Sequence, residues 1–164
     1  MTLAQVPAAS AQISFESPVG WITVQSVNEK ITLLTMDARK AEEFGTSKTL
    51  RDAKKQLQAY FAGKLTKFDL PLELHGTEFQ KSVYKQIAKI PFGKTLSYAE
   101  IAAKIGKPLA SRAVGGAVGS NPIALIVGCH RVMGASGRIT GYSGGDGIPT
   151  KRWLLAHEQI ESVD

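Results

Sequence analysis

The chain changes its pattern at His75-Gly76, and this change limits the folds that it can adopt. Before this pair, short runs rich in β-branched and aromatic residues alternate with turn residues, and after it apolar residues recur at helical spacing. With 164 residues, of which 43% are hydrophobic, the chain can bury a core as one domain or two small ones. We therefore predict an α+β protein with a supporting N-terminal domain at residues 1–76 and a C-terminal domain at residues 77–164.

The first half predicts a small antiparallel sheet with one helix. Residues 11–17, 21–27 and 31–37 are β-rich runs separated by turn-forming stretches. Apolar and polar residues alternate in the second run, so we expect one face of the sheet to be wet. Residues 47–61 carry a helical apolar stripe, and residues 68–74 are expected to add one more strand. Nothing in this half concentrates chemistry.

The second half predicts a mostly helical domain. A capping-box sequence opens a helix over residues 77–90, and further helices are expected at 97–105, about 109–119 and 151–160. The second and third of these are short and are separated by a turn containing glycine. That arrangement matches a helix-turn-helix in outline.

The helix at 109–119 is unusual because it is built from small residues. It contains the pair Gly115-Gly116, and each interior glycine costs about 1 kcal/mol relative to alanine. One explanation is close packing against a neighbouring element. The other is close approach to a ligand such as a DNA groove, in which Arg112 would reach the bases or replace one in the stack.

A lone cysteine follows a short apolar run and precedes a glycine-rich loop. Residues 123–127 predict a buried strand, and after one glycine come Cys129, His130 and Arg131. Single cysteines are commonly small buried hydrophobes. Here the basic neighbours and the glycine-rich loop indicate a site built around a reactive sulfur.

A nucleophilic cysteine needs its thiol pKa, ordinarily about 8.5, to be lowered. In an extended segment His130 would point to the opposite face from Cys129 and would reach the sulfur only through a bend or a water. Glu158 on the last helix is a candidate to orient this histidine. Cysteine proteases, amidotransferases and thiol acceptors of alkyl groups all use such a set, and the residue types alone leave the three open.

The net charge of +6 and the pI of about 9.5 favour a polyanionic partner, nucleic acid before membrane. No run of 18 apolar residues and no basic start with an apolar core occurs, so we expect neither a membrane-spanning helix nor a signal peptide. A single cysteine makes no internal disulfide, and no Cys/His cluster has zinc spacing. We expect a cytoplasmic protein with no metal and no cofactor.

Four segments of the second half, in the same order along the chain, carry a family resemblance. They are TEFQKSVYKQIAKIPFGKTLSYAEIA, SRAVGGAVGSNP, CHRVMGASGRITGYSGG and KRWLLAHE. From Thr77 to Glu158 the chain resembles the O6-alkylguanine-DNA alkyltransferases. The resemblance implies DNA repair in which a flipped guanine presents its O6-alkyl group to Cys129, which accepts the group irreversibly, once per molecule. The implied partner is double-stranded DNA containing O6-alkylguanine. We expect a monomer and leave cooperative binding on DNA open.

The resemblance also implies catalytic roles. His130 would relay the proton of Cys129 through a water, with Glu158 polarising His130. Tyr98 would donate a proton to the guanine ring and help to rotate its phosphate, and Asn121 would support the loop around the cysteine.

Further residues are implied in binding. Arg112 would take the place of the extruded base, while Ala113 and Gly115 would lie against the minor groove, with Tyr98 also at the DNA. The implied substrate-pocket residues are Tyr142, Ser143, Val132 and Gly144.

Two positions depart from the family pattern. Gly128 stands where the family usually has a proline before the cysteine, and a glycine there loosens the backbone. Ala124 stands where some relatives carry another proline. The alternative function is therefore a damage sensor that binds and flips alkylated bases but reacts poorly because of Gly128. An unrelated cysteine hydrolase is a third hypothesis.

Overall fold

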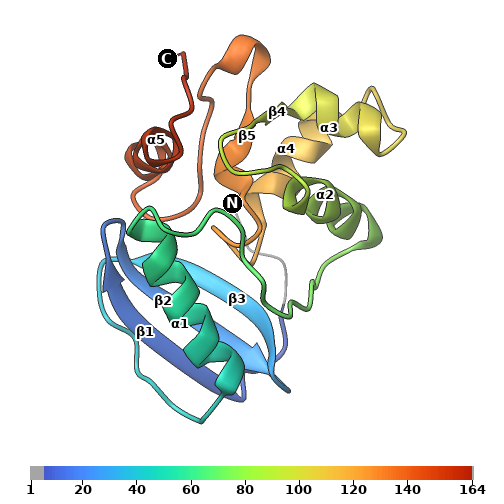
Figure 1. The fold of residues 1–164 in the computed structure, drawn as a ribbon. Coiled ribbons are helices and arrows are strands. Elements are labelled where there is room, and N and C mark those ends of the chain that lie inside the picture. The colour runs from blue at the N-terminus through green and yellow to red at the C-terminus, as the bar shows by residue number, and fades with distance from the viewer. Residues whose placement is uncertain (1–5, 164) are drawn as a thin grey trace.

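The computed structural model describes residues 6–163, and Figure 1 shows their arrangement. The first half contains β1 (Ala11–Ser17), β2 (Gly20–Val27), β3 (Lys30–Asp37) and α1 (Lys48–Phe61). The second half contains α2 (Glu78–Ala88), β4 (Leu96–Ser97), α3 (Tyr98–Lys104), α4 (Ser111–Gly119), β5 (Val132–Met133) and α5 (Ile148–His157), with single 3₁₀ turns at Cys129–Arg131 and Ala135–Gly137. Residues 1–5 and 164, which belong to the two predicted domains, lie outside the described residues, and so does part of the N-terminal segment for which we predicted no signal peptide.

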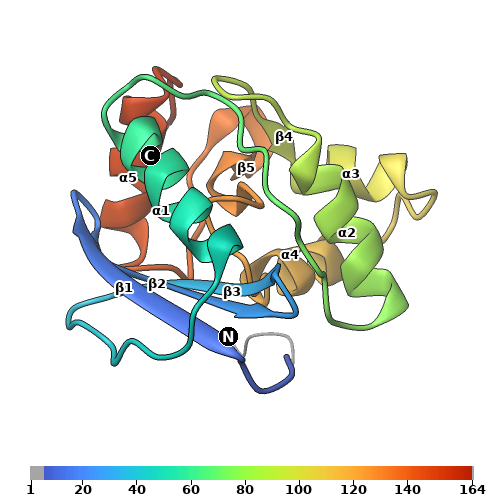
Figure 2. The same cartoon turned by 60° about the horizontal axis from the view of Figure 1, so that its bottom comes forward.

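The predicted sheet and its helix are present. The strands pair antiparallel in the order β1-β2-β3, and α1 lies across one face of the sheet (Figures 1 and 2). Ile22 and Val24 are fully buried on that side, where Leu50 and Leu57 of α1 meet them in one core. The α1 helix begins at the N-cap Ser47, whose hydroxyl accepts a hydrogen bond from the Leu50 amide at 3.1 Å.

The prediction of a wet opposite face was wrong. Ser14 and Thr23 are polar residues of the sheet, yet they are only 3% and 4% exposed. The chain after β3 returns along this region, where Phe44 pairs with Gln12 and the Ala41 amide donates to the Ser14 hydroxyl at 3.0 Å. The alternation correctly marked the polar residues, but it carries no information on a loop that covers them.

Residues 68–74 were also predicted wrongly, because they form no strand. Their only ladder contact is one parallel bridge between Ile31 and Leu72. The Ile31 amide donates to the Pro71 carbonyl at 2.9 Å, and the Ile31 carbonyl accepts from the Glu73 amide at 2.9 Å. Pro71 has no N–H group, so a longer ladder through this residue would lack a donor.

The helices of the second half begin where the capping sequences predicted. Thr77 and Gln80 form a reciprocal capping box for α2, and Ser97 and Glu100 form another for α3. The last helix was predicted at residues 151–160, but α5 begins at Ile148 and ends at His157. Pro149 lies in its first turn, where the missing N–H group of proline costs nothing. Packing of α3 on α4 is compatible with a helix-turn-helix, which stays a prediction.

The predicted strand at residues 123–127 is a tight turn instead. Leu125 adopts a left-handed conformation with φ of 70°, and the Val127 amide donates to the Ile123 carbonyl at 2.9 Å. The Asn121 side chain stabilises this turn, because Oδ1 accepts from the Ile123 amide at 3.0 Å and Nδ2 donates to the Val127 carbonyl at 2.8 Å. A side chain that satisfies the backbone locally competes with a strand ladder, and only Ile123 pairs, with Leu34 of β3.

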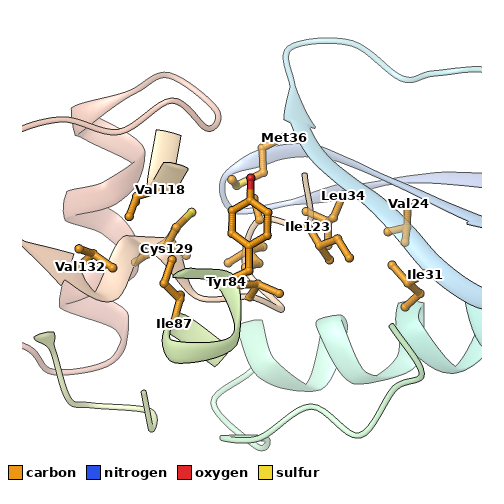
Figure 3. Packing of buried hydrophobic residues seen from close by; sticks show 14 of the residues in the cluster. Val24, Ile31, Leu34, Met36, Tyr84, Ile87, Val118, Ile123, Cys129 and Val132 are labelled. Carbon is orange, nitrogen blue, oxygen red and sulfur yellow. The ribbon is translucent and has the colours of Figure 1, made fainter. Parts of the chain in front are cut away.

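One hydrophobic core spans both halves of the chain. Leu34 and Met36 of β3 meet Tyr84 of α2 and Ile123 in a cluster that extends to Cys129 (Figure 3). The division at residues 76 and 77 into two domains therefore stays a prediction. Across residues 6–163, no helix is long and apolar enough to cross a membrane.

Candidate active site

A cavity of about 890 Å³ lies beside Cys129. It is formed by the start of α3, one side of α4 and the loop after Ile139. The lining residues are Tyr98, Ser111, Arg112, Gly115, Gly116, Val118, Gly119, Cys129, Thr140, Gly141, Tyr142 and Ser143. The fold thus brings together residues that the sequence predicted for catalysis, for DNA binding and for the substrate pocket.

Cys129 begins the 3₁₀ turn and is only 3% exposed. Ile87, Val118 and Val132 lie around it (Figure 3). Burial raises the pKa of the thiol, and the Asn121 and Tyr142 side chains and the charge of Lys151 only partly oppose this rise. Because the thiol is held neutral in the resting protein, it needs a neighbouring base to become a nucleophile.

His130 is paired with Glu158. The two side chains are fully buried, and His130 Nε2 lies 2.6 Å from Glu158 Oε2. Burial alone would raise the pKa of Glu158, but hydrogen bonds from His130, Arg131 and Tyr60 hold it below its usual range. An ionised carboxylate only accepts hydrogen bonds, so Nε2 carries the proton of the neutral imidazole and Nδ1 keeps its lone pair.

The free nitrogen of His130 is suited to act as a base. Nδ1 is buried and has no hydrogen-bond partner among the described residues. Burial lowers the pKa of His130, and the Glu158 carboxylate partly restores it. The ring is therefore neutral near pH 7 and can accept a proton, and Glu158 then stabilises the imidazolium that forms.

Glu158 is the centre of a buried hydrogen-bond network that also includes Tyr60, Gly93, His130 and Arg131, here called the Glu158 network. Arg131 Nε donates to Oε1 at 2.8 Å and Arg131 Nη2 to Oε2 at 3.0 Å. The Tyr60 hydroxyl donates to Oε2 at 2.6 Å, and the Gly93 amide donates to Oε1 at 3.2 Å. Both carboxylate oxygens are thus saturated with donors, which fixes the orientation of the carboxylate.

The positive charge of Arg131 does not face the thiol. Besides Glu158, its guanidinium contacts the Ile90 carbonyl, to which Nη1 donates at 2.8 Å. The cation near Cys129 is instead Lys151 of α5, which is 1% exposed and donates from Nζ to the Val132 carbonyl at 2.6 Å. Burial lowers the pKa of Lys151 to about 8.

A second cavity, of about 250 Å³, reaches Cys129 from the sheet side. Leu34, Met36 and Asp37 of β3 line it together with Gly144. Gly144 packs tightly there, because a Cβ atom on it would lie 2.6 Å from Met36 Cε. The first half, for which we predicted a supporting role, thus contributes one wall of this cavity through β3.

The glycine pair of α4 is not explained by packing within the described residues. A Cβ atom on Gly116 would meet nothing within 4 Å, and one on Gly115 would come no nearer than 3.9 Å to the Tyr98 ring. Arg112 and Ala113 are exposed on the same helix. Packing within the described residues therefore does not require the glycine pair, and close approach to a ligand stays a prediction.

The other predicted site residues are divided between the two cavities, with Val132 in neither. The Tyr98 hydroxyl accepts from Thr140 Oγ1 at 3.2 Å, and Ser143 Oγ donates to the Gly119 carbonyl at 2.9 Å, so both sit on the large cavity. Asn121 lies in the second cavity, which Gly144 also lines. Val132 is fully buried in the core and lines neither cavity; only its carbonyl contacts the site, through Lys151.

Comparison with known proteins identifies the family. The 6-O-methylguanine DNA methyltransferase DNA binding domain matches residues 78–160, and the ribonuclease-like domain of the same family matches residues 12–74. The chain belongs to this family. A methylated-DNA–protein-cysteine methyltransferase of Mycobacterium tuberculosis is 49% identical over 151 residues, covering 89% of this chain and 90% of the relative. One from Methanosarcina acetivorans is 47% identical over 150 residues, covering 88% and 95%.

Solved structures of methyltransferase relatives share the fold. Mycobacterium tuberculosis OGT in complex with DNA superimposes with a TM-score of 0.82 at 47% identity, covering 90% of this chain and 92% of that one. The O6-methylguanine methyltransferase of the same organism gives a TM-score of 0.80 at 46% identity, covering 93% and 95%. The predicted α+β class and the family resemblance are confirmed.

The sequence did not reveal the contributions of Tyr60, Lys151 or Met36 to this methyltransferase site. Tyr60 was assigned only to the apolar stripe of its helix, although a buried tyrosine hydroxyl ordinarily requires a hydrogen-bond partner. That requirement was the one available signal. No sequence signal pointed to Met36 or Lys151, because their roles depend on contacts between segments far apart in the chain.

Proposed function

We propose that this protein repairs DNA by direct reversal, moving the alkyl group from O6 of guanine in double-stranded DNA onto Sγ of Cys129. Family membership supports the reaction, since the similar proteins are named methylated-DNA–protein-cysteine methyltransferases. The observation that carries the proposal is the position of Cys129 on the cavity beside α4, directly followed by the His130–Glu158 pair. A cytoplasmic, reducing compartment would keep the thiol available.

The chemistry follows from the positions of the protons. The Sγ proton passes to His130 Nδ1 through a water, and the resulting imidazolium is stabilised by Glu158. The thiolate attacks the alkyl carbon, an S–C bond forms and the C–O6 bond breaks. The electron pair stays with the guanine, which takes up a proton from Tyr98 and is left repaired. Tyr98 then regains a proton from solvent, and His130 releases its own proton to solvent. The thioether is stable to water, so each molecule reacts once.

Access to the alkyl group requires the guanine to leave the base stack. We assign α4 to the minor groove, with Ala113 and Gly115 against it and Arg112 in the space that the base vacates. Extrusion costs a few kcal/mol, which an inserted side chain offsets. Tyr142 and Ser143 would then hold the guanine in the cavity of about 890 Å³ that they line with Cys129.

Intact-protein mass spectrometry after incubation with a duplex containing O6-methylguanine tests the proposal. We expect a gain of one methyl group per protein molecule, and no gain for Cys129→Ala, which should still bind the duplex. Binding without any mass gain would identify the damage sensor, and repeated turnover of an ester or amide would identify the cysteine hydrolase. We disfavour the sensor because Gly128 leaves Cys129, His130 and Glu158 in place.

A second comparison tests the role of α4. Arg112→Ala should slow methyl transfer from duplex DNA far more than transfer from free O6-benzylguanine, because the free base needs no extrusion. Equal losses with the two substrates would contradict the assignment of Arg112 to the vacated base position.

A further inference from the structure

A tyrosine from the first half of the chain reaches the carboxylate that serves the cysteine. Tyr60 lies on α1, is 1% exposed and donates its hydroxyl to Glu158 Oε2 at 2.6 Å, across 98 residues of sequence. The same oxygen also accepts from His130 Nε2 at 2.6 Å and from Arg131 Nη2 at 3.0 Å. Three donors therefore share one carboxylate oxygen.

We propose that Tyr60 is a positioning residue for alkyl transfer, which sets the strength and direction of the contact between Glu158 and His130. This inference rests on the proposed function. It gives the first half of the protein, which contains the sheet and α1, a part in the reaction in addition to its role in supporting the second half.

The surroundings of Tyr60 hold its hydroxyl in one direction. Its ring makes edge contacts with Phe92 and His157, with centroids 6.1 Å and 4.9 Å away, and a tilted contact with Phe68 at 5.5 Å. The backbone of Tyr60 is fixed as well, because its carbonyl lies 2.7 Å from His157 Nε2. With the ring enclosed by aromatic groups, the carboxylate is the polar partner of the hydroxyl.

The shared oxygen links Tyr60 to the proton affinity of His130. Each donor to Oε2 withdraws negative charge from it, so a third donor weakens the attraction of the carboxylate for a protonated imidazole. Burial and the Glu158 charge raise the pKa of Tyr60 far above its usual value, so the hydroxyl remains a donor throughout the working pH range. Without this hydroxyl, Glu158 would hold the proton on His130 more strongly.

Three other titratable side chains lie near the His130–Glu158 pair and Tyr60. Arg131 in the same turn and Lys151 on α5 both lower the pKa of His130, and His157 on α5 faces the Tyr60 ring. The segment after α2 contributes the neutral Gly93 amide. Among these groups, Tyr60 is the one that α1 supplies, and its hydroxyl can be deleted without changing any charge.

The test is the pH profile of methyl transfer by the full-length Tyr60→Phe protein. Single-turnover rate constants with an O6-methylguanine duplex, measured from pH 5 to 9, should rise as His130 loses its proton. In Tyr60→Phe the midpoint of this rise should move to higher pH, so that at pH values below the midpoint the rate falls about three- to tenfold, the scale of one typical hydrogen bond. At pH 9 the two rates should agree within about twofold.

Phe61→Leu is the matched control. Phe61 is the next residue on α1, its ring contacts those of Tyr60 at 5.3 Å and Trp153 at 5.8 Å, and it has no group that can form a hydrogen bond with Glu158, so its variant measures the loss of aromatic packing alone. This variant should lower the melting temperature and leave the midpoint of the pH profile unchanged. A shift of that midpoint in Phe61→Leu equal to the shift in Tyr60→Phe would overturn the inference.

The outcomes separate the inference from the proposed function. If the wild-type protein transfers no methyl group, the proposed function fails. If it does, and Tyr60→Phe shows an unchanged midpoint or a uniform loss at every pH, the inference fails. NMR titration of the His130 ring in Cys129→Ser, with and without Tyr60→Phe, gives a readout without any reaction. The imidazole should titrate at higher pH when the hydroxyl is absent, and an unchanged titration would overturn the inference.

Discussion

Gly128 stands where the family is expected to carry a proline, and its backbone is one that proline would fit. Its φ of −74° lies within the range to which the proline ring is restricted. The nearest neighbour of this glycine is the Arg131 side chain. A Cβ atom built on Gly128 would lie 3.2 Å from Arg131 Nη1 and 3.3 Å from Arg131 Cδ. Gly128 therefore touches the Glu158 network rather than the path to the sulfur.

We expect Gly128→Pro to raise the free energy of unfolding by about 0.4–1 kcal/mol, because the restricted backbone lowers the entropy of the unfolded chain. Urea denaturation of both proteins measures this difference. A lower stability would show that the Arg131 guanidinium cannot move by the few tenths of an ångström that the ring requires. The methyl-transfer rate should change less than about threefold; a tenfold increase would show instead that Gly128 limits the reaction.

The residues of the site divide into those that the sequence predicted and those that depend on the fold. Cys129, His130 and Glu158 were found from residue chemistry and from the family motifs, and His130 does contact Glu158 from the turn that Cys129 begins. Tyr60 was not found, because 98 residues separate it from its partner and no local pattern encodes that contact. The direction of Arg131 was also inaccessible, since adjacency in sequence does not say which way a side chain points.

Among the elements, α4 bears a composition that reduces its own stability. Because a side chain on Gly116 would meet nothing in the protein, Gly116→Ala should stabilise the free protein by about 1 kcal/mol. The same methyl group would stand between the helix backbone and the groove, so duplex affinity should fall. Urea denaturation and fluorescence anisotropy with a labelled duplex measure the two effects.

Transfer from free O6-benzylguanine is the control for Gly116→Ala, because that reaction needs no groove and its rate should not change. Unchanged or tighter duplex binding would mean that α4 does not approach DNA closely at this residue.

Elements with explicit end signals were predicted well, and buried apolar runs were not. The capping boxes at Thr77 and Ser97 located α2 and α3 to within a residue or two at their starts. The run at 123–127 has the composition of a strand, but the Asn121 side chain satisfies its backbone and turns it. Hydrophobic periodicity reports burial, and it does not report which group satisfies the buried amides.

For the whole molecule, the shared core predicts that the two halves unfold together. Each half carries one tryptophan, Trp21 on β2 and Trp153 on α5, and both are half-buried. In the single-tryptophan variants Trp21→Phe and Trp153→Phe, fluorescence should report transitions that coincide with each other and with far-ultraviolet circular dichroism. Two separated midpoints would show instead that the halves are independent folding units.

The long reach of the Glu158 network has a consequence for a chain that is still being made. Synthesis produces Tyr60 first, then Cys129, and the carboxylate only 28 residues after His130. Until that last segment arrives and folds back, His130 has no anionic partner and the cysteine is an ordinary, weakly nucleophilic thiol. The paired base and the enclosed cysteine therefore exist together only after α5 has folded back, so alkyl transfer that depends on the His130–Glu158 pair is confined to the completed fold.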